Sequence, residues 1–297
     1  MPSLKEVKTR IASVNSTRKI TSAMKMVASS KLHHAQQTID NMRPYEEQLF
    51  SIMSSFMQSL NGEFDAPYTD HREVKRVAIV LYTSNSSLCG GFNANVIKSF
   101  KHKVEKYRSK GIEIAYVYPL GKKAAEAVRK MNFEENKDYS VLLDHPSYEA
   151  AAAIAAEIMN LYNRKDIDQA DVIYHHFKSA GSQILTDEVY LPLILDHIQN
   201  TDTDTNNSTA STAETNYIIE PSRQDILTEL VPKALYLKLY TALLDSLASE
   251  HAARMIAMQV ATDNANDLLQ ELTLTYNKTR QQAITAELLD IVGGSIQ

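Results

Sequence analysis

The stretch LASEHAARMIAMQVATDNANDLLQELTLTYNKTRQQAITAELLDIV, residues 247–292, decides the fold. It lies in a segment from Gln224 to Ile291 that contains no glycine and a single proline, Pro232. A helix of this length spans on the order of 100 Å, whereas globular helices average about 11–12 residues. A periodic pattern this long indicates a coiled coil, a membrane span or a helical repeat.

Apolar residues in this segment recur at intervals of three and four, the a/d pattern of a helix that packs on a partner helix. They are Leu237, Tyr240, Leu244 and Leu247, followed by Met258, Ala261, Ala265, Leu268 and Leu272. His251 and Arg254 occupy the seam positions between the two sets, where solvated rim residues are the alternative interpretation. Charged residues on the other faces exclude a membrane span.

Residues 3–60 are predicted to form a second long helix with the same spacing. Its seam residues are Leu4, Val7, Ile11 and Val14, then Leu32, Ala35, Ile39 and Met42, then Leu49, Met53, Phe56 and Leu60. Between Val14 and Leu32 the register is expected to shift, with Ile20, Met24 and Val27 taking over the seam. Pro44 is expected to kink the helix. Two such helices at opposite ends of one chain predict an antiparallel pair, with the intervening residues inserted at one end.

The first predicted helix is strongly basic. Against Glu6 alone stand Lys5, Lys8, Arg10, Arg18, Lys19, Lys25 and Lys31. Basic residues near a helix N-terminus oppose the helix dipole, so helix stability does not explain them. A partner with an acidic surface explains them. A solvated basic face, or contact with an anionic membrane, is the alternative explanation.

Between the two helices the pattern changes to alternating strands and helices, which predicts a parallel α/β sheet. Strands are expected at 74–84, 112–121, 139–144, 171–180 and 184–195, and helices at 93–111, 122–132 and 147–166. The last strand is expected to run antiparallel to its neighbour, because only a short turn through Gly181 separates them. The predicted fold is therefore a long antiparallel coiled coil carrying an inserted, Rossmann-like α/β domain.

Composition narrows the possible functions. The net charge of −5 over 297 residues argues against nucleic-acid binding. A single cysteine, Cys89, excludes an internal disulfide and a multi-cysteine metal site. The sequence shows no signal-peptide pattern and no apolar run of membrane length, so a soluble chain is expected, associated with a membrane only through partners.

The first strand-to-helix turn, residues 84–91, is where a nucleotide would bind in an α/β enzyme. Its sequence, SNSSLCGG, has neither the G-x-G-x-x-G pattern nor the G-K-[ST] of a phosphate-binding loop. Cys89 is expected to be a buried structural cysteine. The pairs His33–His34 and His175–His176 lack metal-ligand spacing. No catalytic residue, cofactor or metal is therefore assigned to the chain.

Residues Thr201–Asn216, TDTDTNNSTASTAETN, are polar and of low complexity, and are expected to be a flexible linker. The predicted division is an N-terminal shaft helix (1–60), an inserted α/β domain (74–198), a polar linker (199–222) and a C-terminal shaft helix (223–297).

Three motifs together resemble the gamma subunit of F-type ATP synthases. They are SLKEVKTRIASVNSTRKITSAMKMVASSKLHHAQ at 3–36, LCGGFN at 88–93, and SEHAARMIAMQVATDNANDLLQELTLTYNKTRQQAITAELLDIVGG at 249–294. The resemblance implies a rotor. In that family the paired helices form a central shaft inside a hexamer of three alpha and three beta subunits. The α/β domain and lower shaft sit on the epsilon subunit and the membrane ring of c subunits, and ATP chemistry belongs to alpha and beta.

The resemblance also implies contact residues for coupling. Met24 matches the shaft position that faces an acidic lever loop of a beta subunit, with Arg18, Lys19 and Lys25 as the basic side of that contact. Glu250 and Arg254 match polar shaft positions at the same level. Coupling positions near the upper shaft are matched by Gln281, Thr285 and Glu287. The tip, residues 288–296, is expected to sit in an apolar bearing.

The chain departs from the family where Asn85-Ser86-Ser87 replaces a charged pair, which puts that loop's charge contact in doubt. With no transit peptide, the expected location is the cytoplasmic face of a bacterial inner membrane. Two other function classes stay open at this point. One is an α/β enzyme acting alone, which needs a site around Cys89. The other is a non-rotary coiled-coil scaffold, for which a homodimer is expected.

Overall fold

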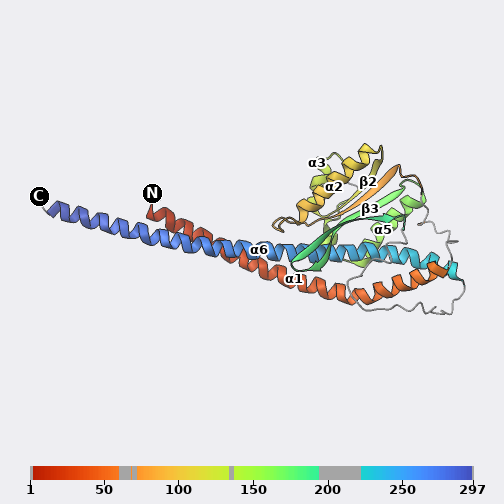
Figure 1. Ribbon diagram of the computed structural model, residues 1–297, viewed down its shortest axis with the longest axis horizontal. Helices are drawn as coiled ribbons and strands as arrows, with labels where there is room; N and C mark the ends of the chain where they lie inside the picture. The colour runs from red at the N-terminus through yellow and green to blue at the C-terminus, as the bar shows by residue number, and fades with distance from the viewer. Residues whose placement is uncertain (1–2, 60–67, 69–71, 134–136, 194–221, 296–297) are drawn as a thin grey trace. The chain divides into compact units, whose positions relative to one another are not determined.

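The computed structural model describes residues 3–59, 68, 72–133, 137–193 and 222–295 (Figure 1). Two long helices lie at the ends of the chain, α1 (Leu4–Ser59) and α6 (Arg223–Ser295). Between them lie β1 (Arg76–Tyr82), α2 (Phe92–Ser109), β2 (Glu113–Leu120), α3 (Lys122–Lys130), α4 (Ser140–Asp144), α5 (Tyr148–Asn163), β3 (Gln169–Ser179) and β4 (Ser182–Leu191). The predicted fold class is confirmed.

The chain divides into two compact units. The shaft unit combines Met1–Ser30 with Arg254–Gln297, and the sheet unit comprises Lys31–Ala253. Both long helices therefore contribute to both units. The polar linker predicted at 199–222 lies almost wholly outside the described residues.

The four strands form one sheet in the order β2-β1-β3-β4. Strand β1 pairs in parallel with β2 and with β3, as the alternation of strands and helices predicts. Strand β4 returns antiparallel to β3, which confirms the hairpin expected around Gly181.

Strand β1 is buried on both of its faces. Val77, Ile79 and Leu81 belong to a core cluster with residues of α2 and α3. Residues 78, 80 and 82 alternate with them and belong to a larger cluster with α1, α5 and α6. A central parallel strand buried in this way is an unbroken apolar run, as residues 77–82 are. Figure 1 shows α2 and α3 on one side of the sheet and α6 along the other.

One predicted strand is wrong. Residues 140–144, expected within a strand at 139–144, form the short helix α4. The Asp138 carboxylate accepts a hydrogen bond from the Ser140 amide at 2.8 Å, which starts a turn, and Asn85 Nδ2 donates to the Ser140 carbonyl at 2.8 Å. Leu142 and Leu143 are both buried. A short apolar run fits either a strand or a buried helical turn, and periodicity alone does not separate them.

The expected register shift in α1 is also wrong. Ile20 and Val27 are 59% and 58% exposed, while Thr21 and Ala28 are buried. The interval of three and four thus continues unbroken from Val14 to Leu32, because polar residues occupy seam positions between them. The helix also continues through Pro44, and α1 bends in the half that contains this residue (Figure 1).

Candidate functional site

The shaft unit is an antiparallel helix pair fixed by polar contacts across its seam. Arg18 Nη1 donates to Asn266 Oδ1 at 3.2 Å, and the hydroxyls of Thr21 and Thr262 lie 2.8 Å apart. In this register Leu4, the first residue of α1, lies opposite about residue 280 of α6. The antiparallel pair predicted from the two heptad patterns is confirmed here.

Basic side chains cover the surface of α1 in the shaft unit. Lys19 is exposed, as are Lys5, Lys8 and Arg10, whereas Lys25 is half-buried. Arg18 is half-buried as well, and its bond to Asn266 directs part of its guanidinium across the seam. The predicted basic contact surface therefore consists of residues that differ in how freely they can reach a partner.

An apolar strip accompanies these charges. Ile20, Met24 and Val27 are spaced by four and three, which places them on one face of a helix. Ile20 and Val27 are exposed and Met24 is half-buried. Because large apolar side chains exposed in a row mark interaction surfaces more often than isolated ones do, this strip extends the predicted contact at Met24.

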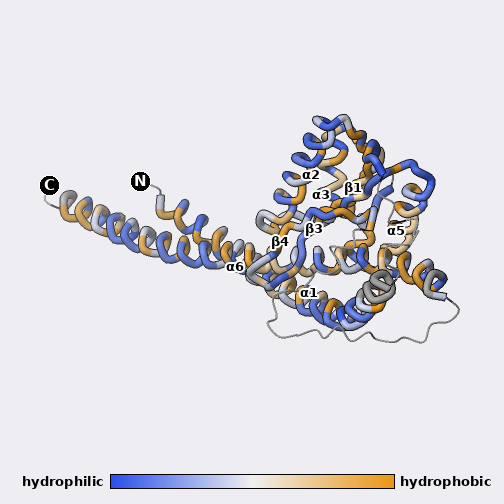
Figure 2. Tube along the Cα trace, turned by 45° about the vertical axis from the view of Figure 1, so that its right-hand side comes forward, coloured by the Kyte–Doolittle hydropathy of each residue, from blue (hydrophilic) through white to orange (hydrophobic). Residues whose placement is uncertain are grey.

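The C-terminal end of α6 continues past the start of α1, and residues 281–292 are all exposed. Gln281 and Thr285 share one face, and the Thr285 hydroxyl donates to the Gln281 carbonyl at 2.9 Å. Glu287 lies on a different face, since six residues turn a helix by about 240°. Large apolar residues reach solvent here, as the mixed hydropathy of this end in Figure 2 shows. They are Ile284, Leu288, Leu289, Ile291 and Val292.

The two polar positions expected at the level of Met24 fall in different units. Glu250 belongs to the sheet unit and is buried, with 6% of its surface exposed. Arg254 opens the α6 part of the shaft unit and is half-buried.

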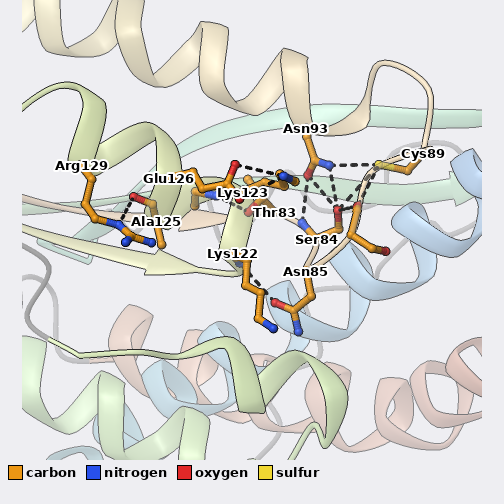
Figure 3. Close-up of polar contacts among 12 residues, drawn as sticks. Thr83, Ser84, Asn85, Cys89, Asn93, Lys122, Lys123, Ala125, Glu126 and Arg129 are labelled. Atoms are coloured by element: carbon orange, nitrogen blue, oxygen red, sulfur yellow. Dashed lines mark hydrogen bonds and ion pairs between the residues drawn. The ribbon is translucent and has the colours of Figure 1, made fainter.

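The loop after β1, where a nucleotide site was considered, is held by its own side chains (Figure 3). Asn93 Oδ1 accepts from the Ser84 amide at 2.9 Å, and Asn93 Nδ2 donates to Cys89 Sγ at 3.1 Å. Asn85 Oδ1 and Thr83 Oγ1 accept from amides in the first turn of α3, at 3.2 and 2.8 Å. These amides, which could cradle a phosphate at a free helix N-terminus, are bound to the protein itself.

Cys89 is buried, as predicted. Nearby, His175 is 3% exposed and stacks on Phe92 with ring centroids 4.5 Å apart. Burial lowers the pKa of His175 to about 4, so the imidazole is neutral near pH 7. Within the described part of the chain its Nδ1 has no hydrogen-bond partner.

A buried charge cluster links α2 to the sheet, and no local sequence pattern predicts it. Asp171 is fully buried and pairs with Lys103 Nζ at 2.9 Å. It also accepts hydrogen bonds from Tyr107 and from Gln169 Nε2, the latter at 2.7 Å. Burial, followed by the charge of Asp171, raises the pKa of Tyr107. Because its partners satisfy the carboxylate, this cluster is a structural joint of the domain.

The described residues contain neither a metal-binding cluster nor a membrane-spanning helix. No group of three His, Cys, Asp or Glu side chains there is arranged to hold a metal ion. No helix in the same residues has an apolar stretch long enough to cross a bilayer.

Known proteins match the chain along its length. The ATP synthase family model matches residues 3–296. The ATP synthase gamma chain of Phocaeicola vulgatus is 54% identical over 296 residues, covering 100% of each chain. That of Bacteroides fragilis is 55% identical over the same length and coverage. The chain belongs to the ATP synthase gamma chain family. The gamma chain of Flavobacterium johnsoniae is more distant, 43% identical over 99% of this chain and 98% of that one.

Solved structures share the fold of this chain. A chain of the Tetrahymena thermophila mitochondrial ATP synthase central stalk and c-ring superposes with a TM-score of 0.56 and 25% identity. It covers 82% of this chain and is itself covered to 99%. A chain of a Euglena gracilis mitochondrial ATP synthase structure gives a TM-score of 0.61 with 22% identity, over 99% of this chain and 93% of that one.

Proposed function

We propose that this gamma chain is the central-stalk rotor of an F1Fo ATP synthase, which couples proton flow through a membrane c-ring to ATP synthesis. The full-length identity of 54% with an ATP synthase gamma chain carries the proposal. The antiparallel helix pair with a protruding end supports it, because such a shape suits a shaft. The non-rotary scaffold has no support from the relatives.

The proposed partners are the alpha and beta subunits, with one gamma chain inside their hexamer, together with the epsilon subunit and the c-ring. Related structures are described as central stalk with c-ring, and as F1 with c-ring. The proposed location is the cytoplasmic face of a bacterial inner membrane, peripheral and held through the complex. The relatives from Phocaeicola and Bacteroides support a bacterial setting.

The rotor acts by differential contact. A shaft with different surfaces on its different sides touches each of three beta subunits differently, and a population of states shifts only as far as such differential contacts allow. The basic residues on α1 and the apolar strip of Ile20, Met24 and Val27 supply two such different surfaces. The seam contact of Arg18 fixes their orientation relative to α6 within the shaft unit.

The contact residues are proposed as follows. Met24 faces an acidic loop of a beta subunit, with Arg18, Lys19 and Lys25 beside it. Glu250 and Arg254 are proposed to make further polar contacts. The contact of a beta subunit with the upper shaft is proposed to involve Gln281, Thr285 and Glu287. Exposure of the last three supports a role in contacts outside the chain. The buried position of Glu250 favours an indirect role through the packing around it.

The chain is proposed to carry no catalytic site, cofactor or metal of its own. The loop after β1 supports this view, because Asn85, Asn93 and Thr83 bind the groups that a nucleotide would use. The division into shaft helices at 1–60 and 223–297, an inserted domain at 74–198 and a linker at 199–222 is retained as part of the proposal.

Native mass spectrometry after co-expression with the alpha and beta subunits of the same source tests the proposal. The expected species contains three alpha subunits, three beta subunits and one gamma chain, and a label on the sheet unit rotates when ATP is added. A chain that stays free, or forms its own dimer of doubled mass, contradicts the rotor and returns the scaffold to first place.

A further inference from the structure

Within the sheet unit, α6 shares one apolar core cluster with β1, β3 and β4. The α6 residues of this cluster are mostly leucines, among them Leu235, Leu239 and Leu243. Apolar burial itself is non-directional, because it depends on the area removed from water. This burial holds α6 to the sheet, and polar contacts between α6 and the strands add a directional constraint on its axial position and rotation.

Two buried tyrosines make directional hydrogen bonds where α6 meets the sheet. Tyr82 at the end of β1 donates its hydroxyl to the Leu239 carbonyl at 2.8 Å, and Tyr190 on β4 donates to the Leu235 carbonyl at 2.8 Å. Both rings are 1% exposed. Residues 235 and 239 lie one helical turn apart on one face. Within a helix each carbonyl already accepts from an amide four residues on, so the hydroxyls make additional bonds.

Strand β3 adds two contacts further along the helix. The Ser249 hydroxyl donates to the His175 carbonyl at 3.1 Å. His176 Nδ1 lies 2.5 Å from Asp245 Oδ2. The four contacts thus come from three strands and meet α6 between residues 235 and 249, about 21 Å of helix. Sliding α6 by one turn, or rotating it about its axis, breaks all four together.

We propose that these four contacts, the register lock, fix α6 to the sheet against torque, so that a load on the sheet unit is delivered to the shaft without slip. The inference rests on the proposed rotor function. Tyr82 and Tyr190 act as positioning residues, because they hold α6 in register and touch no substrate. Burial raises the pKa of both hydroxyls, which keeps them protonated as donors.

The test uses the assembled ATP synthase in vesicles, with Y82F, Y190F and the double variant. Phenylalanine keeps the ring and leaves each carbonyl its amide donor, so no buried group loses its only partner. Hydrogen exchange of the α6 amides near residues 239–243 should accelerate about fivefold for each hydroxyl removed. ATP hydrolysis without a proton gradient should be unchanged, while protons pumped per ATP against a gradient should fall, most in the double variant.

Tyr118→Phe is the matched control. Its ring is fully buried, and its hydroxyl donates to Glu157 of α5 at 3.1 Å and not to a carbonyl of α6. It should leave both readouts of the lock unchanged. If the double variant pumps as many protons per ATP as Y118F does, the lock is refuted.

Asp245→Ala provides an independent route, because the Asp245 side chain is partly exposed and its truncation removes the contact with His176. If the double tyrosine variant fails to assemble, a loss of pumping per ATP is expected in D245A, and unchanged pumping there overturns the lock. If the native complex neither rotates nor pumps, the rotor proposal itself fails.

Discussion

At the scale of single residues, the buried imidazole of His175 makes a measurable link between structure and pH. Its pKa is about 4 in the folded chain because burial disfavours the charged form. The unfolded chain, with an ordinary value near 6.5, binds more protons between these two pH values. The stability contributed by the neutral His175 is therefore complete above about pH 6.5 and is lost as the pH falls towards 4.

We expect H175F to flatten this dependence. Phenylalanine can keep the stacking on Phe92 and leaves no unpaired Nδ1. Between pH 7 and pH 5 the free energy of unfolding of the wild type should fall by about 2 kcal/mol more than that of H175F. Urea unfolding of the purified chains at both pH values measures the difference. Parallel profiles for the two proteins would contradict the assignment.

Gly121 offers a second residue-scale prediction. Its φ is +110°, and a Cβ there would lie 2.6 Å from the Thr83 carbonyl oxygen and 2.8 Å from Leu143 Cδ1. G121A should lower the free energy of unfolding by roughly 2–4 kcal/mol, since it adds backbone strain to a steric clash.

G181A is the control for this substitution, because a Cβ at Gly181 meets nothing within 4 Å. It should change stability by about 0.5 kcal/mol or less. Urea unfolding of both variants decides the matter, and equal effects at the two positions would show that the contacts around Gly121 relax.

The contacts of single side chains were also the features that could least be predicted from the sequence. The hydrogen bonds of Asn85 join residues that are separated by 37 and by 55 positions in the sequence. No local sequence pattern predicts such contacts. Burial of Cys89 was predicted, yet the amide of Asn93 that donates to it was not. Asp171 resembles any charged residue in a strand until Lys103 and Tyr107 are seen beside it.

At the scale of elements, the spacing of residues along α1 predicted which positions lie in the seam better than their apolarity did. The interval of three and four in α1 continues through Arg18 and Thr21, although a hydropathy criterion favoured Ile20, Met24 and Val27. Strands β1 to β4 and helices α2, α3 and α5 follow from alternation and length. Helix α4 does not, because five residues are too few to show a period.

The hydroxyl pair in the seam allows an element-scale prediction. The Thr21 and Thr262 hydroxyls also bond to the Arg18 and Met258 carbonyls of their own helices, at 3.0 and 2.7 Å. Replacing both threonines by valine removes donors and acceptors together and adds apolar seam surface. The double variant should therefore match the wild type in stability or exceed it by up to about 1 kcal/mol.

Thr273→Val is the control, since its hydroxyl makes the same kind of bond to the Leu269 carbonyl but on an exposed face. It should show no gain. Thermal melting of the purified chains followed by circular dichroism compares them, and a clear loss of stability in the seam variant would mean that the hydroxyl pair holds the shaft together.

At the scale of the whole molecule, the architecture followed from the heptad pattern at both ends and the alternation between them. The family followed from three motifs and is borne out by full-length relatives. The contact residues remain predictions, because a contact surface is defined by the partner as much as by this chain.

Met24→Lys tests the proposed contact with beta. A new cation on this face should pair with an acidic loop and hold one orientation of the shaft, so coupling should suffer more than assembly. ATP-driven proton pumping relative to ATP hydrolysis in membrane vesicles is the measurement.

Met26→Lys adds the same charge at a position that is 66% exposed and lies on a different face of α1. It should leave the pumping ratio near that of the wild type. If Met24→Lys also pumps normally, the acidic loop does not meet the shaft at this residue.

The part of α6 that extends past the level of Leu4, the first residue of α1, has a consequence for how the complex is assembled. Isolated helices shorter than about 12–15 residues are only marginally stable in water, and residues 281–292 are exposed throughout. In the free chain these last turns should therefore fray and be open to proteases. Once surrounded by other subunits they regain their helical order, and part of the binding energy is spent on that ordering. The protruding end can thus enter the surrounding subunits as a flexible segment and become an ordered helix only after it has bound.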